Sequence, residues 1–189
     1  MAIAVSGVQV ELREVVLRDK PAELIEVSAK ATVPVLVLPD GAAIDESLNI
    51  MRWALGQNDP EGWLTAGDAN LVQQNDEPFK AALDRYKYPH RYGLETSDLY
   101  RDEGLAILLN LEAKLQNQMF LSRDTQGLSD IAIFPFIRQF AATNQAWFDA
   151  QSLPALQCWL DLLLVSALFG SVMHRYPQWR AGDSPTIFP

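Results

Sequence analysis

The chain has 189 residues, of which 49% are hydrophobic, and its formal net charge is −9 at neutral pH. This length and composition predict a globular protein with one large domain or two small ones, and they exclude a disordered chain. The negative charge disfavours a broad phosphate-binding surface, so we do not expect nucleic acid as a partner, although a few local donors are enough to bind a small anion.

The chain contains one cysteine, Cys158, which excludes an internal disulfide and any paired-cysteine metal motif. We expect it to be a small buried hydrophobe on a helix. His90 and His174 are far apart and fit no ligand spacing, so we expect no metal. The N-terminus lacks the basic region of a signal peptide, and the apolar residues 160–173 include Asp161 and are too few to cross a bilayer. We expect a buried core helix there and a cytoplasmic protein.

The first expected elements are a helix end, a strand and a short helix. Residues 1–5 resemble the last turn of an amphipathic helix that stops at Ser6-Gly7. The alternation in VQVELR (8–13) predicts a half-buried strand. In DKPAELIEVS, Asp19 is a candidate cap and Pro21 fits the first turn of a short helix.

A hairpin and a longer helix are expected next. VPVLVL (33–38) is apolar at consecutive positions, which predicts a strand covered on both faces. A Pro-Asp-Gly turn follows, so AAID (42–45) is its expected antiparallel partner. SLNIMRWALG (47–56) has helical spacing and a stop at Gly56.

These elements lack neighbours on the N-terminal side. A helical fragment of five residues does not nucleate alone, and VPVLVL requires a strand on each edge. We therefore expect a strand and most of a helix, about twenty residues, to precede Met1. A frayed N-terminal tail is the alternative.

The rest of the chain is expected to be helical. Residues 57–67 are polar and contain Pro and Gly, which indicates a linker. Pro78 is expected to kink its helix or to begin a new one. Apolar residues three and four positions apart predict helices near 68–88, 97–118, 129–142 and 153–174.

Two features of the sequence resemble the glutathione S-transferase family. One is the order strand, helix, strand, strand, helix, in which Val33-Pro34 opens a strand and Glu46-Ser47 begins a helix. The other is LSDIAIFPFI (128–137), which is similar to the family's helix-start motif. Asp130 matches that motif, and Gly127 stands where Ser or Thr is usual. A further stretch, DRYKYPHRYG, resembles the bacterial, glutaredoxin-like branch of the family.

The resemblance covers essentially the whole chain except the family's first strand and the start of its first helix. It implies an α+β protein with an incomplete thioredoxin-like domain (1–56), a linker (57–67) and an all-helical C-terminal domain (68–189).

The resemblance also implies a glutathione site. The backbone of Val33, held by a cis bond to Pro34, would pair with the cysteinyl part. Ser47 and the free N–H groups of its helix would bind the γ-glutamyl carboxylate, and Glu46 would bind the amino group. Lys30 would lie within reach of the glycyl carboxylate. Asp130 is expected to be structural.

Each of these assignments has a simpler alternative. Pro34 would then be a trans proline that begins a strand, Glu46 and Ser47 would only cap a helix, and Lys30 would be an ordinary solvated lysine. The family often has Pro and Gly around Lys30, whereas this chain has Ala29 and Ala31.

We assign no catalytic residue. The family uses a Tyr, Ser or Cys at the end of its first strand or the start of its first helix, which would lie upstream of Met1, and Cys158 lies in the wrong region. Four aromatic residues are expected in the core or in a hydrophobic substrate pocket: Tyr86, Tyr88, Tyr92 and Trp147.

The function that the resemblance implies for the full-length form is glutathione conjugation or glutathione-dependent thiol reduction, with glutathione as co-substrate and a small hydrophobic or disulfide second substrate. A non-catalytic dimerisation or ligand-binding module is the alternative. The family further implies a homodimer. Because the thiol-activating segment is expected upstream, we expect the chain as given to bind glutathione weakly or not at all and not to catalyse conjugation.

Overall fold

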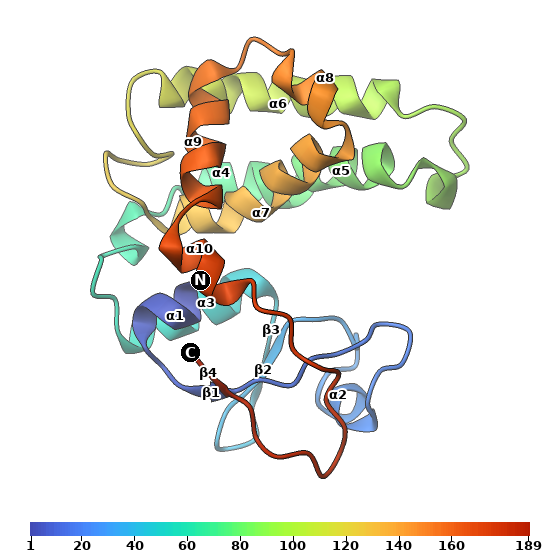
Figure 1. Ribbon diagram of the computed structural model, residues 1–189, viewed down its shortest axis with the longest axis vertical. Helices are drawn as coiled ribbons and strands as arrows, with labels where there is room; N and C mark the ends of the chain where they lie inside the picture. Colours follow the sequence, from blue (N-terminus) through green and yellow to red (C-terminus); the bar gives the residue numbers. More distant parts are fainter. The chain divides into compact units, whose positions relative to one another are not determined.

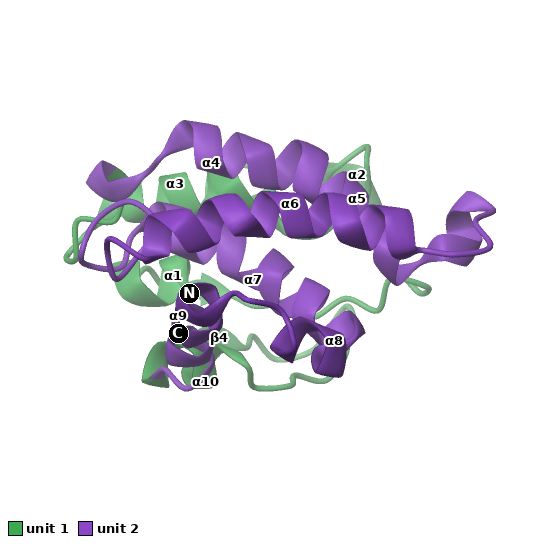
Figure 2. Ribbon diagram, turned by 90° about the horizontal axis from the view of Figure 1, so that it is seen from above, with its two compact units in different colours: residues 1–64, 167–189 green, residues 65–166 purple.

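A computed structural model describes all residues from Met1 to Pro189. The chain forms two compact units, residues 1–64 with 167–189, and residues 65–166 (Figure 2). The expected α+β class is confirmed, because short strands occur in the first unit and the second is helical. The units differ from the division expected from the sequence, since residues 167–189 fold with the N-terminal residues.

The first unit contains four helices and four short strands, which Figure 1 shows. They are α1 (Ala2–Ser6), β1 (Val10–Glu11), α2 (Ala22–Val27), β2 (Val35–Val37), β3 (Ala43–Asp45), α3 (Ser47–Gln57), α10 (Ala167–Val172) and β4 (Ile187–Phe188).

Strand β1 pairs with the C-terminal strand β4, in antiparallel register with Val10 opposite Phe188. The N–H of Leu12 donates to the carbonyl of Thr186 at 2.7 Å, and the N–H of Trp179 donates to the carbonyl of Glu14 at 2.9 Å. The prediction that residues 68–189 are entirely helical was therefore wrong at this end. Periodicity missed β4 because a two-residue strand is too short to show alternation.

Strands β2 and β3 form the predicted antiparallel hairpin, in which Val35 lies opposite Asp45 and Val37 opposite Ala43. The apolar run predicted that strand β2 is covered on both faces, and this prediction was wrong. Val37 is 48% exposed and Val33, just before the strand, is 45% exposed. Only one edge of the strand is paired as well, since β3 is the only strand that pairs with β2.

Helices α1 and α3 pack against each other. Helix α1 ends as predicted at Gly7, whose φ of 69° lets its N–H bond back to the carbonyls of Ile3 and Ala4. The Nδ2 of Asn58 donates to the carbonyl of Ser6 at 2.9 Å, which ties the ends of the two helices together.

Helix α2 begins without a side-chain cap. Pro21 occupies the N-cap position, so the prediction that Asp19 caps this helix was wrong. Asp19 instead accepts a hydrogen bond from Nε2 of Gln178 at 2.9 Å, which is a contact with the C-terminal segment. Sequence proximity favoured the cap, but the returning tail competes for the same carboxylate.

The second unit is a bundle of helices (Figures 1 and 2). Its elements are α4 (Ala69–Gln74), a π-helical turn η2 (Asn75–Phe79), α5 (Lys80–Lys87), a 3₁₀ turn η3 (Pro89–Tyr92), α6 (Asp98–Leu115), α7 (Leu128–Thr143), α8 (Gln145–Asp149) and α9 (Pro154–Leu164). A second 3₁₀ turn, η1 (Leu64–Ala66), lies where the chain passes from one unit to the other. Sequence periodicity predicted the segments that form α4, α5, α6, α7 and α9. It did not predict the 3₁₀ turns, α8 or the break after α9.

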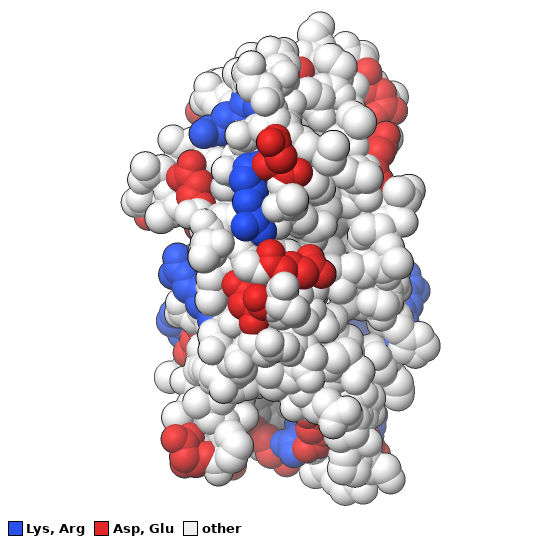
Figure 3. All heavy atoms as spheres, turned by 90° about the vertical axis from the view of Figure 1, so that its left-hand side faces the viewer, with Lys and Arg blue, Asp and Glu red and all other residues white.

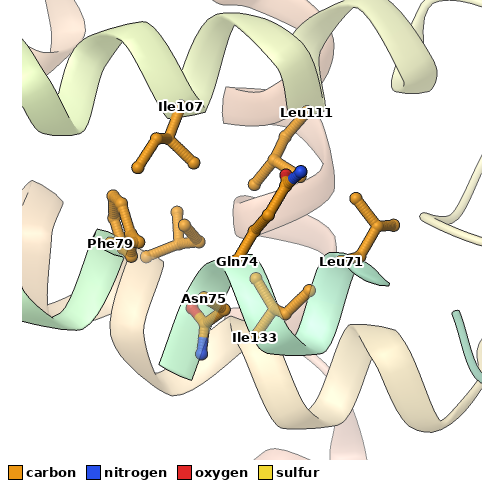
Figure 4. A pocket seen from close by; sticks show the side chains of 8 residues that line it. Leu71, Gln74, Asn75, Phe79, Ile107, Leu111 and Ile133 are labelled. Atoms are coloured by element: carbon orange, nitrogen blue, oxygen red, sulfur yellow. The ribbon is translucent and has the colours of Figure 1, made fainter. Parts of the chain in front are cut away.

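The π-helical turn contains Pro78, where we expected a kink. Figure 4 shows a small cavity beside it, between α4, α6 and α7, with Leu71, Phe79 and Leu111 among its lining. The volume of the cavity is about 10 Å³, which is room for about one water molecule. It is a local packing gap at the widened turn and is too small for a substrate.

Helix α9 buries one face, with Leu156, Trp159 and Leu163 in the core. Cys158 lies on this helix but is exposed, so its predicted burial was wrong. The buried residues recur three and four positions apart, which leaves residue 158 on the other side. The continuous core helix predicted over 160–173 was also wrong, because α9 ends at Leu164 and α10 buries none of its residues.

No helix is long and apolar enough to cross a membrane. On the face shown in Figure 3, acidic and basic side chains are scattered among uncharged ones.

Candidate functional site

The hairpin brings the candidate site residues of the first unit together. Because Val35 lies opposite Asp45, the start of β2 and the end of β3 are neighbours. Val33 therefore comes close in the fold to Glu46 and Ser47, which follow β3 directly. Val33 precedes the paired residues, so the hairpin does not use its N–H or carbonyl group. The Val33–Pro34 bond is cis, as predicted.

The N-terminus of α3 is open. Glu46 occupies the N-cap position with φ 69° and ψ 130°, and no side chain caps the helix. The first turn contains no acidic residue, and Ser47 is exposed. The first N–H groups of a helix have no partner within it, and the helix dipole favours an anion there. A carboxylate can therefore bind to this end, with the Ser47 hydroxyl as an additional donor.

Lys30 precedes Glu46 by sixteen residues in the sequence but lies at the same end of α3. Its Nζ donates to Oε1 of Glu46 at 2.8 Å, and the two side chains are 61% and 64% exposed. The hydrogen bond to Glu46, and then the charge of Glu46, raise the pKa of Lys30. An ammonium and a carboxylate thus stand side by side next to free helix N–H groups. This arrangement is complementary to a small ligand that carries both charges.

Backbone conformation supports this arrangement at two positions. Glu46 and Ala31 are the only non-glycine residues of the chain with positive φ, at 69° and 47°. Such conformations are uncommon outside glycine and cluster at functional sites. The family's usual glycine near Lys30 would adopt this conformation more easily than Ala31.

Asp130 lies in the second unit and is fully buried. Its Oδ2 accepts from the N–H of Gly127 at 3.0 Å, and its Oδ1 accepts from the N–H of Leu121 and from Nε1 of Trp159, both at 2.9 Å. Burial is the largest influence and raises the pKa of Asp130, while these hydrogen bonds oppose it. The carboxylate therefore connects the start of α7, the preceding loop and α9.

Close packing against Ala66 explains why residue 127, at the start of α7, is glycine. A Cβ atom at this position would lie 2.5 Å from the Cβ of Ala66, closer than real Cβ contacts. Only half of the usual capping box is formed, because glycine offers no side-chain acceptor. Ser129 supplies a separate connection, since its Oγ accepts from the N–H of Asp68 at 2.7 Å.

Comparisons with known proteins agree with this geometry. Residues 1–55 match the family model of the glutathione S-transferase N-terminal domain. A search of curated proteins found no match. Glutathione S-transferase III in its apo form superposes with a TM-score of 0.72 at 18% identity, covering 93% of this chain and 91% of that one. The chain has the glutathione S-transferase fold.

Two bacterial structures agree. A glutathione S-transferase from Methylobacillus flagellatus, solved with glutathione bound, has a TM-score of 0.71 at 18% identity and 90% coverage of both chains. A glutathione S-transferase domain-containing protein from Marinobacter aquaeolei has a TM-score of 0.69 at 20% identity, covering 88% of this chain and 90% of that one. The predicted resemblance to the glutathione S-transferase family is confirmed.

Sequence reasoning missed several residues of this glutathione S-transferase fold. Glu112 is buried, and its two carboxylate oxygens accept from the N–H groups of Ala155 and Leu156 at 3.3 and 2.8 Å. It thereby caps α9 from α6. Trp159 is likewise the unpredicted partner of Asp130. Neither contact has a local signal, because the partners are more than twenty residues apart.

The four aromatic residues singled out earlier do not share one environment. Tyr86 is buried and Trp147 lies half-buried against Phe140, at 6.1 Å between ring centroids. Tyr92 is 46% exposed and Tyr88 is half-buried, and both rings face cationic side chains. No three His, Cys, Asp or Glu side chains are grouped so that they could hold a metal ion.

Proposed function

We propose that the protein binds glutathione and acts as a glutathione transferase or a glutathione-dependent thiol reductase. The second substrate is then a small hydrophobic electrophile or a disulfide. The single observation that carries the proposal is the open N-terminus of α3, flanked by the ion pair between Lys30 and Glu46.

Glutathione has charges that fit this end of α3. Its γ-glutamyl end carries a carboxylate and an ammonium. The carboxylate binds to the free N–H groups and the Ser47 hydroxyl, and the ammonium binds to Glu46. Lys30 then turns from Glu46 to the glycyl carboxylate, and the backbone of Val33 pairs with the cysteinyl residue. The family match over residues 1–55 and a related structure solved with glutathione bound support the proposal.

Calorimetric titration with glutathione tests binding. Ser47→Ala is expected to weaken binding by about 1–3 kcal/mol, the range for hydrogen bonds to charged groups. Ser184→Ala is the matched control, because Ser184 is exposed and lies in the C-terminal segment. Equal affinities of the two variants would contradict the assignment of Ser47.

A non-catalytic ligand-binding module is the second candidate. It is favoured by the fact that no residue of the described chain is assigned as the thiol-activating group. The two candidates are separated by following glutathione consumption with a chlorinated aromatic and, separately, with a disulfide. Binding together with turnover of either compound supports the enzyme. Binding without turnover supports the module, and no binding contradicts both.

We further propose that the protein is a cytoplasmic homodimer, as the family resemblance implies. Sedimentation at micromolar concentration tests the oligomeric state directly. A monomer would contradict the dimer without affecting the glutathione proposal.

A further inference from the structure

The second unit carries a group of aromatic and cationic side chains at the end of α5, in η3 and at the start of α6. Four of the five tyrosines of the chain lie between residues 86 and 100. We name the tyrosine–cation cluster by its six members, which are Arg85, Lys87, Tyr88, Arg91, Tyr92 and Tyr100.

Each cation of the cluster lies over a ring. The guanidinium of Arg85 is 5.0 Å from the ring centroid of Tyr92 and 5.4 Å from that of Tyr100. The ring of Tyr88 is contacted by Arg91 at 4.0 Å and by Lys87 at 5.0 Å. Such contacts fix the position of a cation without neutralising its charge.

The cations of the cluster have no carboxylate within ion-pair distance. Neighbouring cations are different, since Lys80 pairs with Asp84 at 2.9 Å and Arg101 pairs with Asp98 at 2.8 Å. Arg85 donates to the carbonyl of Ala81, and Lys87 donates to the amide oxygen of Gln139. Three cationic side chains without an ion pair are therefore grouped on one part of a chain whose net charge is −9.

We propose that the tyrosine–cation cluster is a docking surface for an acidic segment of a partner protein. Guanidinium groups held on rings are weakly hydrated and keep their outer N–H groups for carboxylates, which they bind in a two-pronged geometry. Tyr and Arg are also the residue types that dominate binding energy at protein interfaces. Charge complementarity thus selects carboxylate-rich chains.

The ring contacts favour a peptide over single-stranded nucleic acid. Proteins that bind single strands stack bases on free aromatic faces. In the cluster, Tyr88 is contacted by two cations, and the rings of Tyr92 and Tyr100 both lie against Arg85. The cations keep N–H groups that no hydrogen bond uses, whereas each of these rings already has a cation on at least one face.

Fluorescence anisotropy with a labelled oligoglutamate peptide at low salt tests the proposal. Binding is expected to weaken as salt is added, because exposed charges are screened. The double variant Arg85→Gln/Arg91→Gln is expected to lose at least about tenfold in affinity, as for the loss of charge-assisted hydrogen bonds. Arg18→Gln/Arg52→Gln is the matched control. It removes the same charge at exposed positions without ring contacts, and we expect less than about a twofold change there.

Several results would overturn the proposal. One is that oligoglutamate does not bind to the wild type. The others are an equal loss of affinity in the two double variants, or tighter binding of an oligothymidine strand than of the peptide. If Arg85→Gln unfolds the protein, Arg91→Gln alone decides, because Arg91 is exposed and its side chain makes no hydrogen bond or ion pair. An unchanged affinity of that variant also counts against the cluster.

Discussion

The interactions within the two units of the molecule differ. Most of the fully buried apolar side chains lie in residues 65–166, whereas residues 167–189 contribute none. In the helical unit the buried carboxylates of Asp130 and Glu112 accept backbone N–H groups. In the first unit the ion pairs, such as the one between Lys30 and Glu46, are on the surface.

This difference separates stability from function. Buried, fully paired polar groups specify one packing of helices, and removing one partner leaves the other unsatisfied. Exposed pairs contribute little to stability but open at low cost when a ligand arrives. We therefore expect the helical unit to depend more strongly on its polar contacts for stability, whereas the open helix end of the first unit is the proposed binding site.

The largest expected effect is that of Asp130→Ala in the helical unit. The change leaves three buried donors without an acceptor, on Gly127, Leu121 and Trp159. The free energy of unfolding is expected to fall by at least about 3 kcal/mol. Urea denaturation measures it, with the exposed Asp124→Ala as control. If the free energy of unfolding fell no more than in the control, the buried carboxylate would not stabilise the helical unit as proposed.

A smaller effect is expected from adding one methyl group. Gly127→Ala places a Cβ 2.5 Å from that of Ala66 and is expected to destabilise by about 1–3 kcal/mol. Gly56→Ala in α3 is the matched change in the first unit, where a Cβ meets nothing within 4 Å. It is expected to stabilise by about 0.5–1 kcal/mol, because alanine restricts the unfolded chain. Thermal unfolding compares the two, and the same sign for both would contradict the packing difference.

The pH dependence of stability tests the effect of burying Asp130 in the helical unit. Burial raises its pKa in the folded protein above the ordinary 3.8, so the folded state binds the proton at higher pH than the unfolded chain does. Its contribution is fully present below pH 3.8 and is lost as pH rises through the folded pKa. The stability of the wild type relative to Asp130→Asn is therefore expected to fall over that window. A relative stability that rises with pH would show that the hydrogen bonds outweigh burial.

The smallest effect is expected from deleting residues 177–189. The deletion removes β4 and the acceptor of the Leu12 N–H, the carbonyl of Thr186. Hydrogen exchange at Leu12 is expected to accelerate, while amides in α7 keep their protection, because local opening is confined to the unit that loses contacts. Faster exchange in α7 would mean that the two units unfold together.

The sequence predicted the elements whose signals are local. The hairpin followed from an apolar run and a Pro-Asp-Gly turn, and the end of α1 from Ser6-Gly7. The start of α7 followed from Asp130, which bonds to a backbone group three residues away. The neighbourhood of Val33, Glu46 and Ser47 also follows from the hairpin register. Their roles in binding glutathione remain a proposal.

Features that depend on distant partners were missed or wrong. Strand β4 exists because the tail returns to residues 10–14, and the same return takes Asp19 away from α2. Cys158 was placed on the correct helix but on the wrong face. The burial of β2 was overestimated because an apolar run does not show which elements pack on its faces.

The place of the candidate glutathione site was inferred from the family resemblance. The sequence by itself determined the α+β class and most helix boundaries. These depend on periodicity, turns and caps, whose interactions span a few residues. Only the tertiary structure decided the grouping of residues 167–189 with the first unit, the links from Asp130 to Trp159 and from Glu112 to α9, and the pairing of Lys30 with Glu46. Each of these joins segments far apart in the chain, and such contacts form only where packing brings the segments together.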